Sequence, residues 1–208
     1  FKFTSQVDDT IEVKFVHVFD DVPRPFFVAP HVGIPTGDYH YSSGIMTVET
    51  SQHRKVRFNY TTGIGEFYDG WGYRINPFIE WRPSKHWRLS VELDERHFFD
   101  LDACQGSTRA LDTCRQETNE PSKRSTDFMT RLIRFRVLVA FTQDIFWSTV
   151  LQYDNLSNDL SLQTRFRWIF EPGRELFLVV GQGFDATPGD VRAESTQPIA
   201  KLRWTFRF

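Results

Sequence analysis

No stretch of this sequence stays apolar for the roughly eighteen residues that a helix needs to cross a bilayer, so a transmembrane helix is excluded. Long patterns of helical periodicity are missing as well. Charge of one sign is also lacking: the formal net charge is −2 and no basic patch stands apart, so nothing favours a nucleic-acid partner. Residues Phe1–Thr4 are not a basic segment followed by an apolar run, and we expect a mature chain or a fragment.

Reactive side chains are few and scattered. The two cysteines, Cys104 and Cys114, lie ten residues apart in a polar segment, which favours a disulfide formed in an oxidising compartment, with two free thiols as the alternative. No group of His, Cys or carboxylate residues has the spacing of a zinc site. His97 lies near Asp94 and Asp100, but no nucleophile is paired with it at a recognisable spacing. We therefore expect no metal, no cofactor and no enzymatic activity.

Aromatic and charged residues are plentiful and finely interleaved. Aromatic residues make up 16% of the chain, with 21 Phe and 6 Trp, yet 25% of residues are charged and the mean hydropathy is −0.42. The C-terminal stretch Lys201–Phe208 shows the pattern most clearly, because apolar and mostly basic residues alternate without a break. Period 2 is typical of a strand, and a strand with lipid on one side and water on the other fits this composition.

Similar alternating segments recur along the whole chain, separated by turn residues. Ten strands are expected: Thr10–Phe19, Asp38–Glu49, Arg54–Thr62, Trp71–Trp81, Trp87–His97, Thr126–Phe141, Ile145–Asp154, Leu160–Phe170, Glu175–Phe184 and Lys201–Phe208. The proline-containing connection Asp20–Gly37, the long segment Asp100–Ser125 and the polar segment Asp185–Gln197 are expected to be loops. The pattern predicts an all-β fold: an up-and-down antiparallel transmembrane β-barrel of about ten strands, in one domain over residues 1–208.

Alternation also predicts which residues share a face. The polar face is expected to line the lumen, as a pore or a plug, with Arg57, Arg74, Glu80, Arg82, Arg88, Glu92, Asp94, Arg134, Arg136, Asp154, Arg165, Arg167 and Arg203. The lipid-facing and interfacial aromatic residues are expected to be Trp71, Trp81, Trp87, Trp147, Trp168, Trp204, Phe206 and Phe208. A soluble, lipocalin-like barrel would reverse these faces, but aromatic ends on the apolar face, arginine along the polar face and strands of about ten residues favour the membrane.

Several stretches, in a characteristic order, resemble one family: Ile34–Tyr39, Gly65–Gly70, Trp81–Ser84, Leu151–Ser157, Arg165–Trp168, Leu176–Val179 and the terminal Trp204–Phe208. Together they are similar to the C-terminal barrel region of bacterial outer-membrane proteins of largely unknown function. Those proteins usually carry an N-terminal domain similar to carbohydrate-binding module family 9, which this sequence lacks. The resemblance implies a bacterial outer-membrane location and a C-terminal piece of a larger protein or a shortened relative. The final aromatic looks like the signal that the outer-membrane insertion machinery reads.

Short connections alternate with longer ones, which places both termini on the periplasmic side and the Cys104–Cys114 loop outside the cell. The expected partners are outer-membrane lipid or lipopolysaccharide and the insertion machinery. Either the strands close on themselves, or they pair with a protein partner or with missing barrel strands. The expected function is a channel or passive transporter with an Arg-rich lumen that favours anions. The alternative is a structural or assembly subunit with a plugged lumen, because about eight strands leave an interior that side chains fill.

Overall fold

The computed structural model describes residues 1–29, 32–102, 125–187 and 190–205, and these residues form antiparallel strands without any helix. No helix that could cross a membrane is therefore present in the described part of the chain. Cys104, Cys114, Phe206 and Phe208 lie outside the described residues, so the expected disulfide and the terminal aromatic residues stay predictions.

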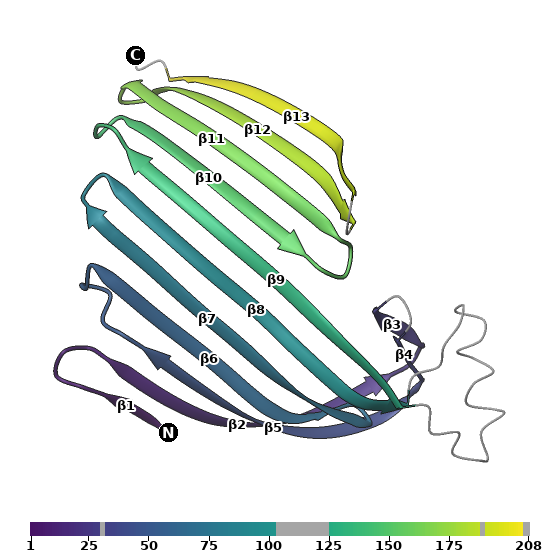
Figure 1. Ribbon diagram of the computed structural model, residues 1–208. Helices are drawn as coiled ribbons and strands as arrows, with labels where there is room; N and C mark the ends of the chain where they lie inside the picture. The colour runs from purple at the N-terminus through teal and green to yellow at the C-terminus, as the bar shows by residue number, and fades with distance from the viewer. Residues whose placement is uncertain (30–31, 103–124, 188–189, 206–208) are drawn as a thin grey trace. The chain divides into compact units, whose positions relative to one another are not determined.

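Thirteen strands follow one another in the part of the chain that the structure describes (Figure 1). They are β1 (Lys2–Thr4), β2 (Thr10–Val22), β3 (Phe26–Ala29), β4 (Val32–Ile34), β5 (Gly37–Glu49), β6 (Val56–Phe67), β7 (Gly70–Ser84), β8 (Trp87–Asp102), β9 (Ser125–Ala140), β10 (Ile145–Asp154), β11 (Asp159–Glu171), β12 (Arg174–Thr187) and β13 (Asp190–Trp204). Eleven of them make one sheet in the order β1-β2-β5-β6-β7-β8-β9-β10-β11-β12-β13, and β3 pairs with β4 separately. Apart from the excursion of β3 and β4, this is the expected meander.

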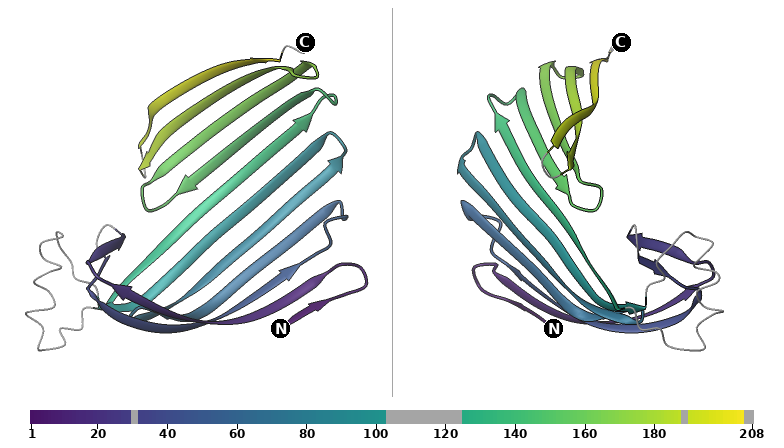
Figure 2. Two further views of the ribbon diagram at one scale, coloured as in Figure 1. Left: turned by 180° about the vertical axis from the view of Figure 1, so that it is seen from behind. Right: turned by 45° about the vertical axis from the view of Figure 1, so that its right-hand side comes forward.

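A strand lies at each of the ten expected places, the last of them followed only to Trp204, and Ile145–Asp154 has the predicted bounds. Both views of Figure 2 show β10 to β13 side by side, as their continuous antiparallel registers require. Tight turns join β10 to β11 and β11 to β12: in the Glu171–Arg174 turn, Gly173 has a φ of 89°, which a residue without a Cβ adopts at low cost. The antiparallel all-β prediction is confirmed. The strand order begins at β1 and ends at β13 without a closing pair among the described strands, so barrel closure stays a prediction.

Three expectations about loops and strand limits were wrong. The proline-containing connection holds the β3–β4 hairpin, and a short strand β1 precedes the first expected strand. The polar segment after residue 185 is not a loop, because β12 extends to Thr187 and β13 begins at Asp190. Every residue of β13 is exposed, so this edge strand carries no burial pattern that would reveal it, and its backbone pairing with β12 stabilises it instead.

Contacts divide the chain into two compact units, and β6 to β9 run through both. The first unit comprises residues 1–49, 60–76 and 94–130, and the second comprises 50–59, 77–93 and 131–208. In the first unit the buried apolar side chains of the described residues are Val22, Val32, Ile34 and Leu101; in the second there is Val139. Neither unit therefore contains a core on the scale of a soluble domain of this length.

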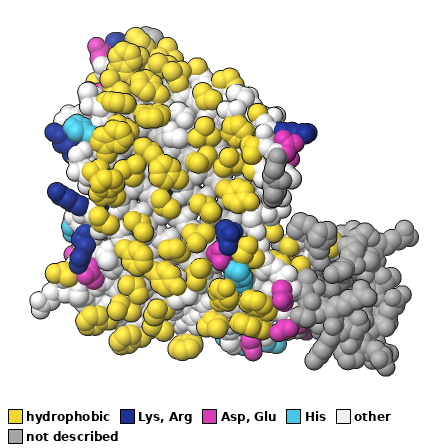
Figure 3. Space-filling model, viewed as in Figure 1, with side chains coloured by type: hydrophobic (Ala, Val, Ile, Leu, Met, Phe, Trp, Pro, Cys, Tyr) yellow, Lys and Arg dark blue, Asp and Glu magenta, His cyan; other side chains and the backbone are white. Residues whose placement is uncertain are grey.

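Large apolar side chains lie on the surface instead. Phe15 is 89% exposed, Ile64 62% and Trp81 51%, and Figure 3 shows one face of the described strands covered largely by hydrophobic side chains, with most charges at its margins. Monomeric soluble proteins rarely expose apolar patches of more than a few hundred Å². This apolar face therefore requires a partner surface or an apolar solvent.

Candidate functional site on the polar face

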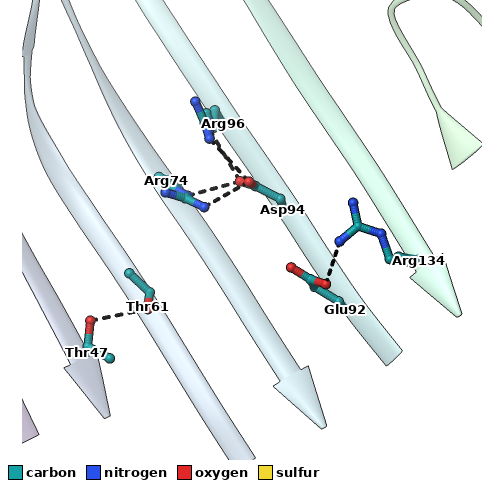
Figure 4. Close-up of polar contacts among 7 residues, drawn as sticks. All are labelled: Thr47, Thr61, Arg74, Glu92, Asp94, Arg96 and Arg134. Atoms are coloured by element: carbon teal, nitrogen blue, oxygen red, sulfur yellow. Dashed lines mark hydrogen bonds and ion pairs between the residues drawn. The ribbon is translucent and has the colours of Figure 1, made fainter. Parts of the chain in front are cut away.

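The polar face carries arginines that share carboxylates across neighbouring strands. In the first unit, Asp94 on β8 accepts two hydrogen bonds from Arg74 on β7, Nε to Oδ1 at 3.0 Å and Nη2 to Oδ2 at 2.8 Å (Figure 4). Arg96, two residues along β8, contacts the same carboxylate at 3.3 and 3.2 Å. Asp94 thus holds Arg74 in bidentate geometry and Arg96 more loosely.

In the second unit, Glu92 on β8 accepts a hydrogen bond from Nη1 of Arg134 on β9 at 2.9 Å, and Nε of Arg134 donates to Gln152 on β10 at 3.2 Å. Glu80 on β7 accepts a hydrogen bond from Nε of Arg82 at 2.7 Å, while Arg88 on β8 stands 3.8 Å away. Three neighbouring pairs of strands are thereby linked through side chains as well as through the backbone.

Glu175 makes the most extended of these contacts, because it lies on β12 between two arginine-bearing strands. Its Oε2 accepts bonds from Arg167 on β11 at 3.0 and 2.6 Å, and its Oε1 accepts one from Arg203 on β13 at 3.2 Å. Glu175 is 6% exposed. Glu175 therefore links the edge strand β13 to β12 and β11 through side-chain hydrogen bonds.

Seven arginines share four carboxylates in these contacts, which leaves three positive charges uncompensated. Arg136 and Arg165 add to this surplus, since neither forms an ion pair within the described part of the chain. Arg57 lies over the ring of Phe78 at 5.6 Å, and Asp154 instead caps a turn by accepting the Leu156 amide at 2.8 Å. The polar face thus has a net positive charge, and ion pairs and hydrogen bonds join many of its side chains.

A cavity of about 250 Å³ indents the polar face of the first unit. Its lining includes Arg74, Arg96, Tyr41, Phe98 and Gly63. The glycines in this region allow the strands to approach: a Cβ on Gly65 would stand 2.4 Å from the Ser42 carbonyl oxygen, and one on Gly72 would stand 2.5 Å from that of His97. Two guanidinium groups, aromatic rings and a glycine-lined floor therefore meet in one hollow.

The β3–β4 hairpin packs beside this aromatic region. Val32 and Leu101 form a small buried cluster, against which Phe67, Phe98 and Phe128 pack. Phe67 and Phe98 are also cavity residues, and their ring centroids are 4.3 Å apart. The proline-containing connection therefore lies against the side of the first unit that bears the cavity.

Tyr68, in the turn between β6 and β7, links this aromatic region to β2. Its hydroxyl donates a hydrogen bond to Oδ2 of Asp20 on β2 at 2.9 Å, and its ring meets that of Tyr39 edge-on at 4.9 Å. Burial, followed by the bond to Asp20, raises the pKa of Tyr68 well above its usual value. The phenol is thus held in its protonated form.

The six predicted interfacial tryptophans that are described are all exposed, between 37% and 51%, and alternation puts them on the apolar faces of their strands. Trp147 pairs with Phe166, and Arg174 lies 4.2 Å from the ring of Trp204. This arrangement is consistent with the predicted grouping of aromatic residues, while contact with lipid stays a prediction.

The residues predicted to line the lumen did not include Arg96 or Glu175, although both fall on polar positions of alternating strands. The prediction also linked His97 with Asp94 and Asp100, whereas Nε2 of His97 contacts Oε1 of Glu95 at 2.8 Å and its ring stacks on Tyr73. Glu95 and His97 occupy positions on the apolar face of β8, where each provides a polar contact for the other.

One serine–histidine pair was also missed, because its members lie on different strands. Nδ1 of His17 is 2.9 Å from Oγ of Ser42, its direct neighbour in the β2–β5 register. No carboxylate contacts the His17 ring among the described residues, so the pair lacks the third group that orients a catalytic base. No group of three or more metal-ligating side chains occurs among those residues either.

Comparison with models of known protein families, with curated proteins and with solved structures found no match. The likeness to outer-membrane barrel regions therefore rests on the sequence motifs alone.

Proposed function

We propose that this chain is part of an integral outer-membrane β-barrel whose polar face lines a lumen for the passive passage of small anions. The supporting observation is the pairing of an exposed apolar face with a basic polar face that carries its own cross-strand ion pairs. In lipid, the apolar face needs no protein cover, because the hydrocarbon core is its solvent.

The position of the β3–β4 hairpin supports this orientation over a lipocalin-like barrel. A lipocalin encloses its apolar face, and its loops close over that face. Here the hairpin packs on Phe67, Phe98 and Phe128, whose strand positions alternate with exposed apolar-face residues such as Ile64. A connection that packs on the polar side supports that side as the interior of the proposed barrel.

Anions are the solutes that the charge distribution supports. The three uncompensated positive charges of the ion-pair groups, together with Arg136 and Arg165, give the polar face a net basic character. Rings of arginine side chains favour anions in pores. Barrel edges must also be satisfied in lipid, so β1 and β13 require strand partners, from this protein or from another chain.

A second function is a structural barrel with a closed interior. The ion pairs and the hairpin supply the contacts for it, because side chains that pair with one another occupy interior space and leave fewer donors for a passing solute. Such a barrel would hold a partner, or serve in assembly, through its connections.

Electrical recording in planar bilayers separates the two functions. The folded chain, first shown to shift its gel mobility on boiling, is inserted into a bilayer with a potassium chloride gradient. A stable conductance with a reversal potential toward chloride supports the anion channel. A folded barrel that inserts but stays electrically silent supports the closed structural barrel. A chain whose mobility never shifts on boiling would count against both.

A further inference from the structure

The cavity in the first unit has a size that suits one ring rather than a larger ligand. Its volume of about 250 Å³ lies just below the range of drug-sized pockets, which begins near 300 Å³. Apolar surface on Tyr41, Ile45 and Phe98 forms part of its lining. Aromatic side chains pack well against flat rings through offset or edge-on contacts, so these residues favour a planar body in the ligand.

The charged rim of the cavity can receive one anion. Two guanidinium groups, from Arg74 and Arg96, flank the carboxylate of Asp94, which leaves one positive charge among these three side chains. Glu66 also borders the cavity, but alternation along β6 puts its side chain on the opposite face, and its Oε2 accepts the Ser42 amide at 2.9 Å. The bidentate bonds to Arg74, at 3.0 and 2.8 Å, are shorter than the 3.3 and 3.2 Å contacts of Arg96. The side chain of Arg96 is also 45% exposed. Arg96 is therefore the member that an incoming carboxylate can engage without dismantling the Arg74–Asp94 pair.

The floor of the cavity is open at one glycine. A Cβ on Gly63 would meet the Gly44 carbonyl oxygen at 3.4 Å and Cγ1 of Ile45 at 3.5 Å, which is ordinary contact. The space above Gly63 is thus available, in contrast to the backbone clashes that a Cβ on Gly65 or Gly72 would cause. A ligand can use this space, and a side chain introduced there would fill it.

We propose that this cavity binds a small carboxylate that carries one flat ring, with the carboxylate on Arg96 and the ring over the floor at Gly63. The residues that would bind the ligand all lie in the first unit, whereas the role of this cavity as a solute site rests on the proposed anion channel. The site makes the polar face selective for one class of anion rather than merely basic.

The test titrates the full chain, folded in detergent micelles, with benzoate and with its neutral analogue benzamide, by calorimetry or ligand-observed NMR. Benzoate is expected to bind with a Kd on the order of 1 mM, a value typical of a fragment-sized ligand, and benzamide at least about tenfold more weakly. Equal affinity for the two ligands would overturn the proposal, and so would inorganic phosphate displacing benzoate at equal concentration, because the ring would then contribute nothing.

Two variants locate the site, each with a matched control. Gly63→Val fills the floor and Arg96→Gln removes the rim charge, and each is expected to weaken benzoate binding roughly tenfold. Gly44→Val is the control for the first, since a Cβ there meets Phe15 at 3.7 Å on the opposite face. Arg88→Gln is the control for the second, since Arg88 is the loosely held partner of Glu80 and does not line the cavity. Unchanged binding in Gly63→Val, or equal losses in Gly44→Val, would refute the site.

The binding experiment and the bilayer experiment test separate proposals, so one proposal can be rejected while the other is kept. A chain that binds benzoate through Gly63 and Arg96 but conducts no current keeps the site and rejects the channel. A chain that conducts anions without binding benzoate keeps the channel and rejects the site.

Discussion

The polar faces of the two units use similar side chains differently. In the first unit, Asp94 gathers Arg74 and Arg96 at the rim of a glycine-floored cavity. In the second unit, Glu175 is almost fully buried and joins arginines from the strands on both sides of its own. One carboxylate borders an open hollow, whereas the other works as a brace across three strands. The same pair of residue types can thus form a binding surface or a mechanical link, depending on whether the neighbouring positions are glycine or bulky.

The largest effect is expected where a glycine permits close strand approach. Gly65→Val would drive its Cβ into the Ser42 carbonyl oxygen, so we expect a loss of at least about 3 kcal/mol in the free energy of unfolding and poor refolding. Gly181→Val in the second unit is the matched control, because a Cβ there meets its nearest atom only at 4.0 Å. Urea unfolding followed by intrinsic fluorescence measures both. Equal stability of the two variants would show that the first unit has no special need for glycine.

A smaller loss of stability is expected when a carboxylate is neutralised. Asp94→Asn should cost about 1–2 kcal/mol, because it weakens charge-assisted bonds to two arginines that water can partly replace. Glu175→Gln should cost more than Asp94→Asn, since Glu175 is the more buried and holds the edge strand β13. The midpoint temperature of the gel-mobility shift compares them. The reverse order would contradict the bracing role of Glu175.

Ion selectivity should change more in Asp94→Asn than in Glu175→Gln, which is the reverse of their order in stability. Asp94→Asn leaves Arg74 and Arg96 without a counter-charge beside an open cavity, so the chloride-to-potassium permeability ratio should rise roughly two- to threefold in the proposed channel. Glu175→Gln should change the ratio less, because neither Glu175 nor its partners Arg167 and Arg203 line the cavity. Reversal potentials in a salt gradient provide the measurement. A fall in the ratio for Asp94→Asn would reject an anionic pathway past this cavity.

The smallest effect concerns Tyr68. Its folded pKa lies above the unfolded value of about 10, so the phenol stabilises the folded state fully below that pH and loses this contribution as the pH rises further. Unfolding free energies measured from pH 8 to pH 11 should therefore fall more steeply at the alkaline end in the wild type than in Tyr68→Phe. Parallel curves for the two proteins would show that Tyr68 is not coupled to folding.

Much of the fold could be predicted because period-2 alternation is a local property. The ten strands and their two faces follow from residues such as Trp147, Leu151 and Tyr153 standing against Ser148 and Gln152. The short strand β1, the β3–β4 hairpin and the first half of β13 were not predicted. The hairpin depends on contacts with Leu101, far away in the sequence, and β13 is exposed on both faces, so neither leaves a local signal.

The candidate site was less predictable, because its members come from different strands. Alternation placed Arg74 and Asp94 on the polar face, but it could not say that Arg96 shares the same carboxylate or that glycines lie beside it. Register decides these contacts, and a shift of one residue would have moved every side chain to the other face.

Local alternation was enough to predict most of the strands and the separation of apolar from basic residues, since each depends only on neighbours along the chain. The tertiary structure decided which arginine shares which carboxylate, where glycine opens a cavity, and that the proline-containing connection lies over Phe67 and Phe98. Those features arise from residues that are distant in sequence and meet only when the strands pair in one register.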